Sequence, residues 1–521
     1  MKIPAFLGIA LAMSASAFAQ TAAPAAPTLT AGAEFKGLRF DWDPVPGASW
    51  YQLELRAHQA GAFTKQGGDL PSNATSTHFS FPLHLFDWTY ARYRLAACNS
   101  AGCTRSAEVS VSDLRRDAVG YFKAALPQQS ASLGNQVDLA PDGYTMVATA
   151  PGEVKTTNGV TKYGAAYVFR RDGNGKWTQR ARLDANATFV AISATGNTIA
   201  AALNNEVVDN SRRGQVDVFH WGNNVYTRSR IPRPDVDTIS GVQLSDSGYV
   251  LAVTGMSAGN TVTTIYKSTN SVWSKIGTVS AAEYCWNTTL TGDGKTLAAV
   301  CRQGGETGPW RDYVRVLSGS TWTTRAEIDL DYPDLDDDRS GDYHDGFAVD
   351  ATGDTIAVHT GRERQGNQSG GAVSVYHRDA GTYLNVATLL SGAWNAYQDL
   401  NLYFGYSIAM SADGLTLAVG HPADVGKGLG PRAAPLLEGT SPTGAVFVYR
   451  LTDSWRLANM VKPNYINPGE AYYLEFGRMA ALSGTGKTLA VGVFGEDSSA
   501  KGIDGNWADA SLKGSGAIFM Y

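Results

Sequence analysis

The sequence predicts an all-β protein in which a small two-layer sandwich precedes a closed ring of similar small sheets. Three observations predict this fold class. Short runs of alternating apolar and polar residues, separated by turn residues, continue through most of the chain. One nine-residue phrase recurs seven times. Glycine supplies 57 of the 521 residues, a composition that favours short strands and many turns over long helices.

The first 26 residues predict an export signal and a linker. Lys2, an apolar run from Ala5 to Met13 and the small-residue stretch SASAFAQ are typical of a secretory signal over residues 1–19, with cleavage expected after Ala19. Residues 20–26 then form an Ala/Pro-rich linker. The apolar run is shorter than the roughly 18 to 20 residues that span a bilayer, and no cysteine near the cleavage site could carry a lipid. We therefore expect a secreted, periplasmic or extracellular protein without a membrane span.

Length and charge restrict the organisation and the partners. About 500 residues exceed one ordinary hydrophobic core, so two domains or a repeat array are expected. Acidic and basic residues are interspersed and give a net charge of -5. A nucleic-acid binder would usually show a basic face, so no nucleic-acid partner is expected. We expect a monomer.

Residues 27–113 show the pattern of a small antiparallel sandwich. Alternating runs such as LRFDWDPVPGASWYQLELRA and YARYRLAACNSAGCTRSAEVSVS are separated by Pro/Gly turns. The stretch resembles a fibronectin type III domain through Trp42, the passage around Tyr51, and Tyr93. The resemblance implies that Trp42 and Tyr93 are core anchors, with Tyr93 at the place of a tyrosine corner. Exposed aromatic residues that bind carbohydrate are the alternative interpretation.

The four cysteines form two local pairs, Cys98 with Cys103 and Cys285 with Cys301. Each pair spans a predicted hairpin, and a turn centred on Asp293 places Cys285 opposite Cys301. An exported chain with an even number of cysteines is expected to oxidise them. Metal binding is the rival interpretation, but no further ligand lies at zinc spacing near either pair.

The recurring phrase predicts a tight turn that joins two strands. Its copies are APDGYTMVA from Ala140, SATGNTIAA from Ser193, SDSGYVLAV from Ser245, TGDGKTLAA from Thr291, DATGDTIAV from Asp350, SADGLTLAV from Ser411 and SGTGKTLAV from Ser483. In six copies a Ser, Thr or Asp lies three residues before the glycine. The short oxygen side chain can cap the turn, and glycine can adopt the positive φ that follows.

Two more strands follow each turn in most copies. A Val- and aromatic-rich third strand recurs in forms such as GAAYVFRR, GAVSVYHR and GAVFVYRL, and a fourth strand begins at a Trp or Tyr, as in WTQRARL and WTTRAEI. The turn glycines are 53, 52, 46, 59, 61 and 72 residues apart. Four strands at such a period, apolar on both faces, predict a seven-bladed β-propeller over residues 119–521.

The ends of this region predict how the ring closes. The last copy stops at Tyr521 after its third strand, GAIFMY. The segment VGYFKAALPQQ, which precedes the first copy, resembles a fourth strand. We therefore expect residues 119–127 to pair with the last strand, so that the ring has no free edge.

The copies resemble FG-GAP repeats, the blades of integrin alpha-subunit heads and of many bacterial surface proteins. Phe404-Gly405 and Phe476-Gly477 match the Phe-Gly element, and His421-Pro422 and Ala150-Pro151 echo the Ala-Pro element. Gly-Ala-Val at 444–446 matches the third strand. The resemblance covers residues 119–521 and is weakest in the second to fourth copies.

The resemblance also implies calcium sites in Asp-rich loops. The stretch DLDYPDLDDDRSGDYHDG offers one candidate, with Asp334, Asp336, Asp338 and Asp342 as ligands. Several hard oxygens close together suit calcium. The glycine, Gly341, comes two residues later than the familiar loop spacing, so a solvated acidic loop is the alternative.

Two insertions are candidates for ligand contacts because function is often carried by long loops on a rigid scaffold. They span residues 422–443 and 496–514, and their exposed candidates are Arg432, Asp504 and Trp507. Variation in loop length without a ligand is the alternative.

No catalytic motif appears: the chain has no G-x-S-x-G element, HExxH or phosphate loop. We therefore favour a non-enzymatic, exported binding or adhesion-like protein that presents propeller loops to a protein or glycan partner. The alternative is a polysaccharide-active lyase or hydrolase with its site in the propeller channel. Convergent His, Arg, Tyr or carboxylate side chains at the channel mouth would favour that enzyme. A structural scaffold in an envelope assembly is a third hypothesis.

Overall fold

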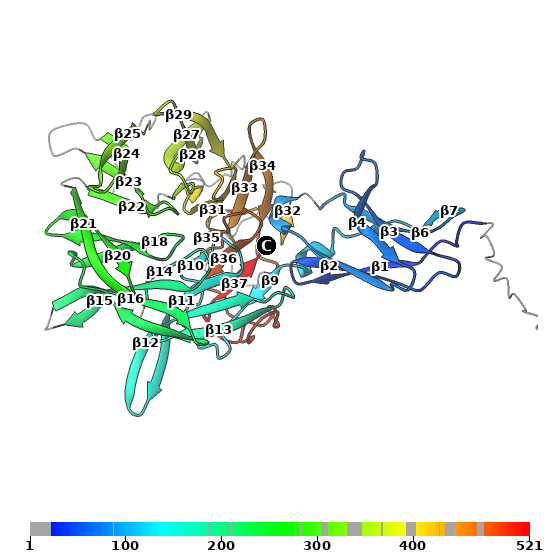
Figure 1. Cartoon of the computed structure of the whole chain (residues 1–521), viewed down its shortest axis with the longest axis horizontal. Helices are drawn as coiled ribbons and strands as arrows, with labels where there is room; N and C mark the ends of the chain where they lie inside the picture. The colour runs from blue at the N-terminus through cyan, green and yellow to red at the C-terminus, as the bar shows by residue number, and fades with distance from the viewer. Residues whose placement is uncertain are drawn as a thin grey trace, which may run out of the picture. The chain divides into compact units, whose positions relative to one another are not determined.

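The computed structural model forms two compact units, built almost entirely from antiparallel strands (Figure 1). It describes residues 22–86, 88–185, 187–208, 211–281, 284–303, 311–330, 346–365, 368–391, 403–426, 428–432, 443–465 and 474–521. The first unit comprises the described residues of Met1–Gly32, with Leu38–Phe79 and Tyr90–Ser112. The second comprises Ala33–Gly37, Ser80–Thr89 and Asp113–Tyr521. The only helical elements in the described ranges are the 3-10 turn η1 (Leu83–Leu85) and the single turn α1 (Leu114–Asp117).

The first unit is built from two antiparallel sheets. Its strands are β1 (Leu29–Glu34), β2 (Gly37–Trp42), β3 (Trp50–Arg56), β4 (Thr64–Pro71), β5 (Ser76–Ser80), β6 (Arg92–Asn99), β7 (Gly102–Arg105) and β8 (Val109–Ser110). One sheet has the order β1-β2-β5, and the other has the order β4-β3-β6-β7 with β8 on β6. Alternate residues of β2 and β3 are buried, which is the pattern of strands that cover a core on one face.

Both aromatic residues that the sequence assigned to this core are buried. Trp42 is 5% exposed and Tyr93 is fully buried, with its ring 4.6 Å from that of Phe40. The tyrosine-corner interpretation is not supported, because the Tyr93 hydroxyl has no hydrogen-bond partner. Tyr51 instead accepts a hydrogen bond from the Val45 amide at 2.7 Å. Burial of the whole Tyr93 side chain, rather than a backbone contact of its hydroxyl, accounts for its place in the core.

The second unit contains seven sheets among the described residues, numbered here 1 to 7 in the order of the sequence phrase. Sheet 1 has β10 (Val137–Leu139), β11 (Thr145–Thr157), β12 (Val160–Arg171) and β13 (Trp177–Leu183); sheet 2 has β14 (Phe189–Ile192), β15 (Thr198–Val208), β16 (Ser211–Gly222) and β17 (Val225–Arg230). Sheet 3 has β18 (Thr238–Leu244), β19 (Val250–Ser257), β20 (Asn260–Thr269) and β21 (Val272–Ala281); sheet 4 has β22 (Tyr284–Leu290), β23 (Thr296–Gln303), β24 (Arg311–Ser318) and β25 (Thr323–Asp329).

The last three sheets follow the same plan. Sheet 5 has β26 (Phe347–Val349), β27 (Thr355–Gln365), β28 (Gln368–Asp379) and β29 (Thr382–Leu390); sheet 6 has β30 (Ile408–Met410), β31 (Thr416–His421), β33 (Ala445–Leu451) and β34 (Trp455–Val461), with β32 (Pro431–Arg432) on β34. Sheet 7 has β35 (Met479–Leu482), β36 (Leu489–Val493), β37 (Ala517–Met520) and β9 (Gly120–Phe122). Repeated four-stranded sheets, buried on both faces, give the architecture of a β-propeller.

The repeated turn has the expected capping geometry. In the six copies with a polar residue at the first position, its side-chain oxygen accepts the amide of the residue five positions later, at 2.9 to 3.1 Å. The turn glycines all have φ between 68° and 79°. The sequence phrase therefore encodes the turn between the first two strands of each sheet.

The turn glycines also connect neighbouring sheets. Each lies against the side chain at the start of the second strand of the preceding sheet, or just before it in the case of Thr488, and a Cβ would be crowded in most of the turns. The pairs are Gly196 with Thr145, Gly248 with Thr198, Gly294 with Val250, Gly353 with Thr296, Gly414 with Thr355, Gly486 with Thr416 and Gly143 with Thr488. The last pair joins the first sheet to the seventh, so this series of contacts returns to its start.

Sheet 7 is assembled from both ends of this unit. Ile518, Phe519 and Met520 of β37 pair with Phe122, Tyr121 and Gly120 of β9. The predicted pairing of the segment after the sandwich with the final strand is confirmed. Figure 1 shows β9 beside β37, with the C-terminus at the same place.

Both predicted disulfides are present. Cys98 bonds Cys103 across β6 and β7, and Cys285 bonds Cys301 across β22 and β23. Free cysteines are absent. In the part of the chain that the structure describes, no helix is long and apolar enough to cross a membrane.

Several sequence predictions lie outside the described residues. These are the export signal over residues 1–19 and the four proposed calcium ligands, Asp334, Asp336, Asp338 and Asp342.

Candidate functional site

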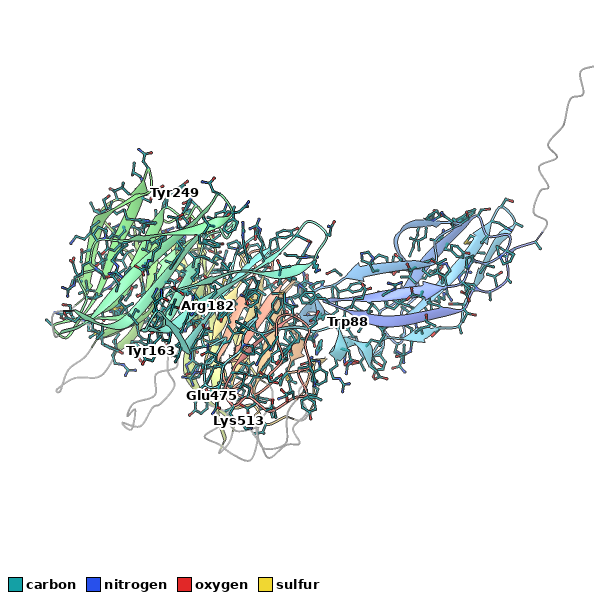
Figure 2. All side chains as sticks on the ribbon, turned by 90° about the horizontal axis from the view of Figure 1, so that it is seen from below. Trp88, Tyr163, Arg182, Tyr249, Glu475 and Lys513 are labelled. Carbon is teal, nitrogen blue, oxygen red and sulfur yellow. A yellow bond between two sulfur atoms is a disulfide. The ribbon has the colours of Figure 1, made fainter. Side chains whose placement is uncertain are left out.

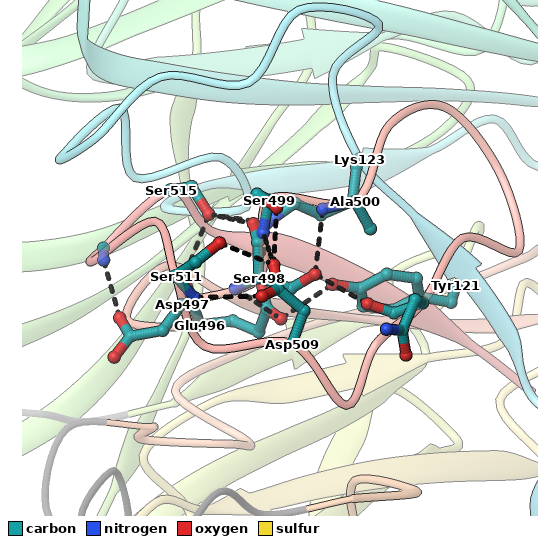
Figure 3. A network of polar contacts seen from close by, with 12 residues as sticks. Tyr121, Lys123, Glu496, Asp497, Ser498, Ser499, Ala500, Asp509, Ser511 and Ser515 are labelled. Carbon is teal, nitrogen blue, oxygen red and sulfur yellow. Dashed lines mark hydrogen bonds and ion pairs between the residues drawn. The ribbon is translucent and has the colours of Figure 1, made fainter.

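The strongest candidate site is the connection between β36 and β37, residues 494–516, which we call the seam loop. A buried carboxylate, Glu496, organises it (Figure 3). Glu496 accepts hydrogen bonds from the Lys123 ammonium at 2.6 Å, the Tyr121 hydroxyl at 2.7 Å and the Ser498 amide at 3.0 Å. Tyr121 and Lys123 come from β9 and the residue that follows it, so the loop is attached to the strand that closes the ring.

The Lys123–Glu496 pair is removed from water. Lys123 is fully buried and Glu496 is 4% exposed. Burial lowers the pKa of Lys123 and raises the pKa of Glu496, and the attraction between the two groups opposes both shifts. Lys123 also donates to the Ser515 hydroxyl at 2.6 Å. Loss of either partner would leave a buried charge uncompensated, at a cost of about 3–5 kcal/mol.

Two further carboxylates fix the rest of the seam loop. Asp497 pairs with Lys513 and accepts the Gly514 amide at 2.7 Å. Asp509 accepts both the amide and the hydroxyl of Ser499 at 2.5 Å. These hydrogen bonds from Ser499 lower the pKa of the Asp509 carboxyl to about 2. The loop is therefore held in one conformation by its own side chains.

The seam loop also covers the outer edge of β9. Ile503 forms an antiparallel bridge with Phe122, and the Lys123 amide donates to the Gly502 carbonyl at 2.7 Å. Asp504, a predicted contact residue, is exposed, but its carboxylate accepts the Tyr121 amide at 3.2 Å. Its first role is thus to hold the loop against the strand edge, which would otherwise be free to pair with another chain.

Trp507, the second predicted contact residue, forms an aromatic pair. Its ring lies 5.1 Å from that of Tyr465, which follows β34 of the neighbouring sheet, and both residues are partly exposed. The third, Arg432, lies in β32, whose backbone pairs with Met460; its side chain is outside the described part of the structure. The structure therefore brings Asp504 and Trp507 into one loop.

Lys123 and Glu496 were not predicted as functional residues from the sequence, although a signal for this arrangement exists. Glu496 lies three positions after β36. Asp424 lies three positions after β31 of sheet 6, and Glu153 occupies the equivalent position in sheet 1. Asp424 pairs with buried Lys462, and Glu153 pairs with Arg182 at 2.6 Å; Figure 2 labels Arg182. The echoes of the Ala-Pro element at Ala150-Pro151 and His421-Pro422 lie just before these acids, with one residue between each proline and its acid. Such pairs fix the loop that leaves each of these sheets.

A second candidate is a cavity of about 330 Å³ along the first strands. Residues in or beside the first strand of all seven sheets line it, including Gln136, Val190, Gln243, Asn287, Phe347, Ile408 and Met479. Its one cationic side chain, Arg478, pairs with Glu475 and lies 5.4 Å from the Tyr406 ring. The described lining contains no Asp, Glu, His, Lys or Cys. Arg478 and Tyr406 are of the residue types that would favour an enzyme, whereas no carboxylate or histidine occurs in the described lining.

Metal-ligating side chains do not gather in the described ranges: no group of three or more His, Cys, Asp or Glu is placed to hold an ion. This finding does not reach the Asp334–Asp342 segment.

Comparison with known proteins yields likenesses of structure alone. No protein-family model matches the sequence, and no curated protein matches it. Similar solved structures include hydrazine synthase of Kuenenia stuttgartiensis, with 14% identity, 71% of this chain and 93% of that chain covered and a TM-score of 0.42. The periplasmic gluconolactonase of Pseudomonas aeruginosa has 13% identity, coverage of 80% and 97%, and a TM-score of 0.38. The β-propeller domain of the trilobed protease from Pyrococcus furiosus has 11% identity, coverage of 71% and 90%, and a TM-score of 0.39.

Proposed function

We propose that this chain is an exported, non-enzymatic binding protein, adhesion-like in character, whose seam loop contacts a protein or glycan partner. In this proposal a fibronectin type III-like sandwich over residues 27–113 precedes a seven-bladed, FG-GAP-like propeller over residues 119–521. The two disulfides favour an oxidising compartment, as an exported protein requires.

One observation carries the proposal: a loop fixed by buried charges presents a partly exposed aromatic pair. Trp507 and Tyr465 offer a rigid apolar surface, while the Glu496 network holds the loop that bears Trp507. A loop that is already ordered loses little conformational entropy when it binds, so more of the contact energy remains as affinity. Tryptophan and tyrosine are also the residues that most often dominate binding energy at interfaces.

The enzyme alternative receives less support. The described lining of the channel cavity includes Tyr406 and Arg478, but Arg478 is paired with Glu475 and the lining has no carboxylate. A polysaccharide lyase or hydrolase needs a base or a pair of carboxylates beside the reacting bond.

The proposal is tested with the mature protein, residues 20–521, on glycan and surface-protein arrays, followed by titration of each ligand found. We expect Trp507→Ala to weaken binding at least tenfold, or about 1.4 kcal/mol. The matched control is Tyr163→Ala, because Tyr163 is an aromatic residue 60% exposed in sheet 1 (Figure 2). Binding unchanged by Trp507→Ala, or turnover of a polysaccharide, would contradict the proposal.

Calcium remains a proposed ligand of Asp334, Asp336, Asp338 and Asp342. Titration with calcium, followed by calorimetry and by thermal unfolding with and without chelator, tests this site. No heat and no change in melting temperature at millimolar calcium would remove it.

A further inference from the structure

Neighbouring sheets of the second unit enclose grooves on the side of the repeated turns. In each groove the residue that begins the second strand of one sheet faces the turn glycine of the next. Two of the grooves are open cavities, about 330 Å³ between sheets 2 and 3 and about 410 Å³ between sheets 5 and 6. We call them groove 2–3 and groove 5–6.

The two open grooves are built from equivalent positions. A histidine of the third strand lies 3.1 Å from the threonine that begins the second strand, as His220 with Thr198 and as His377 with Thr355. A tryptophan that begins the fourth strand of the following sheet closes the other side, as Trp273 and Trp455. Because the two grooves share this His–Thr pair and this tryptophan, the other differences between their linings should determine which ligand each can bind.

At two other junctions between sheets, the chain fills the equivalent groove with one of its own nitrogen-bearing side chains. Between sheets 7 and 1, Lys36 donates to the Thr488 hydroxyl at 2.9 Å, and Phe35 packs on Phe122 beside it. Between sheets 6 and 7, His84 Nε2 lies 2.8 Å from the carbonyl oxygen of the turn glycine, Gly486. The structure thus shows what occupies a filled groove: a side-chain nitrogen that reaches the threonine hydroxyl or the turn carbonyl.

Groove 5–6 differs from groove 2–3 in its charge. Four carboxylates line it, Asp350, Asp354, Asp413 and Asp453, whereas groove 2–3 has Asn270 at the position of Asp453. Arg378 pairs with Asp354 at 2.6 Å, and Asp350 and Asp413 accept amides of their own turns. Asp453 is exposed at the rim. The groove therefore keeps a net negative charge beside apolar walls.

We propose that groove 5–6 is a docking site for a turn of a partner protein that inserts a lysine side chain next to an apolar one. Charge complementarity selects the ammonium group, and the Phe35-Lys36 turn between sheets 7 and 1 shows how the fold accommodates it. Leu415, Leu451 and Trp455 supply the surface for the apolar neighbour. This site is separate from the seam loop and does not depend on the proposed function.

The electrostatic difference between the grooves supports this choice of partner. Burial and, second, the charge of Arg171 lower the pKa of Lys36 to about 7, so the groove between sheets 7 and 1 disfavours the ammonium that it holds. The position equivalent to Arg171 in groove 5–6 is uncharged Leu451, and the four carboxylates of the lining outnumber the two arginines beside it, Arg378 on Asp354 and Arg456 on Ser454. An inserted lysine would meet attraction there instead of repulsion.

The experiment uses the mature chain and a fluorescein-labelled cyclic peptide of residues 33–38, Ala-Glu-Phe-Lys-Gly-Leu, measured by fluorescence anisotropy. We expect the wild type to bind, and the binding to weaken as salt rises. Asp453→Asn should weaken binding three- to tenfold, and Asp453→Lys should abolish it. Asn270→Asp, the reciprocal change in groove 2–3, is the matched control and should not weaken binding.

Several outcomes would overturn the proposal: no binding by the wild type, equal binding of a peptide with norleucine in place of lysine, or unchanged binding by Asp453→Lys. Binding of glucosamine without binding of the peptide would make the groove a sugar site, which also overturns it. Trp507→Ala should leave peptide binding unchanged, so failure of the seam-loop function remains distinguishable.

Discussion

At the scale of single residues, two buried lysines of the second unit are each held by a buried carboxylate from another segment of the chain. Lys123 and Glu496 are 373 residues apart, and Lys462 and Asp424 are 38 apart. Each pair joins the fourth strand of a sheet to the loop after its second strand. Such pairs are poor sources of net stability, but the loss of one partner is costly, so they specify one loop conformation.

Asp138 shows how a single half-buried carboxylate couples the fold to pH. It accepts the amides of Ile192 at 2.9 Å and Leu139 at 2.8 Å and so joins sheets 1 and 2. Burial, with a contribution from the charge of Asp246, raises the pKa of Asp138 to about 6. A carboxyl with a raised folded pKa stabilises the fold at low pH, and this contribution is lost as the pH rises through 6.

We therefore predict that Asp138→Asn becomes more stable relative to the wild type as the pH rises from 5 to 7.5. The asparagine oxygen can still accept an amide, and it carries no charge. The relative gain is at most about 2 kcal/mol, since one pKa unit corresponds to about 1.4 kcal/mol. Denaturant unfolding of both proteins at the two pH values measures it, with surface Asp379→Asn as the control. The same difference at both pH values would contradict the assignment.

At the scale of elements, the repeated turn performs two tasks at one glycine. The positive φ joins the first two strands, and the missing side chain lets the next sheet approach. At Gly196, φ is 70° and a Cβ would lie 2.4 Å from the buried side chain of Thr145. The conformational freedom of glycine explains the positive φ, and packing between sheets explains why no side chain fits there.

We predict that Gly196→Ala destabilises the protein by about 2–4 kcal/mol, the sum of the cost of a left-handed alanine and of overpacking. Gly222→Ala is the control, because Gly222 has open space around it and is outside the positive-φ set. The control should change stability by less than about 0.5 kcal/mol. Chemical denaturation measures both, and equal effects would show that the contact with Thr145 is unimportant.

At the scale of the whole molecule, sheet 7 is the place where the second unit is closed. β9 pairs with β37, the seam loop covers the outer edge of β9, and the Tyr521 hydroxyl donates to the Lys462 carbonyl of sheet 6 at 2.5 Å. Contacts of Gly143 with Thr488 continue the series into sheet 1. Stability of the ring should therefore depend on a few residues at its end.

We predict that removal of residues 517–521 exposes β9 and β36 and makes the second unit sensitive to proteolysis. A synthetic peptide of residues 516–521, added in excess, should restore part of the protection. The same peptide with Ile518→Pro should not, because proline removes an amide donor from the middle of the strand. Limited proteolysis measures each case. Full resistance of the truncated chain would mean that closure does not stabilise the ring.

The sequence by itself determined the periodic features of this protein. The turn phrase, its glycines, the aromatic start of the fourth strands and both cysteine pairs are local patterns, and local patterns report strands and turns directly. Even the pairing of β9 with β37 was predictable, because one repeat lacked a strand and another segment offered it.

Only the tertiary structure decided which side chains meet. Lys123 and Glu496, the Trp507–Tyr465 pair and the carboxylates of groove 5–6 come from segments that are distant in the sequence or belong to neighbouring sheets. Hydrophobic period and turn chemistry act over a few residues, whereas the ring brings sheets together at its circumference. The candidate sites arise from that long-range packing, and for this reason the repeats alone did not reveal them.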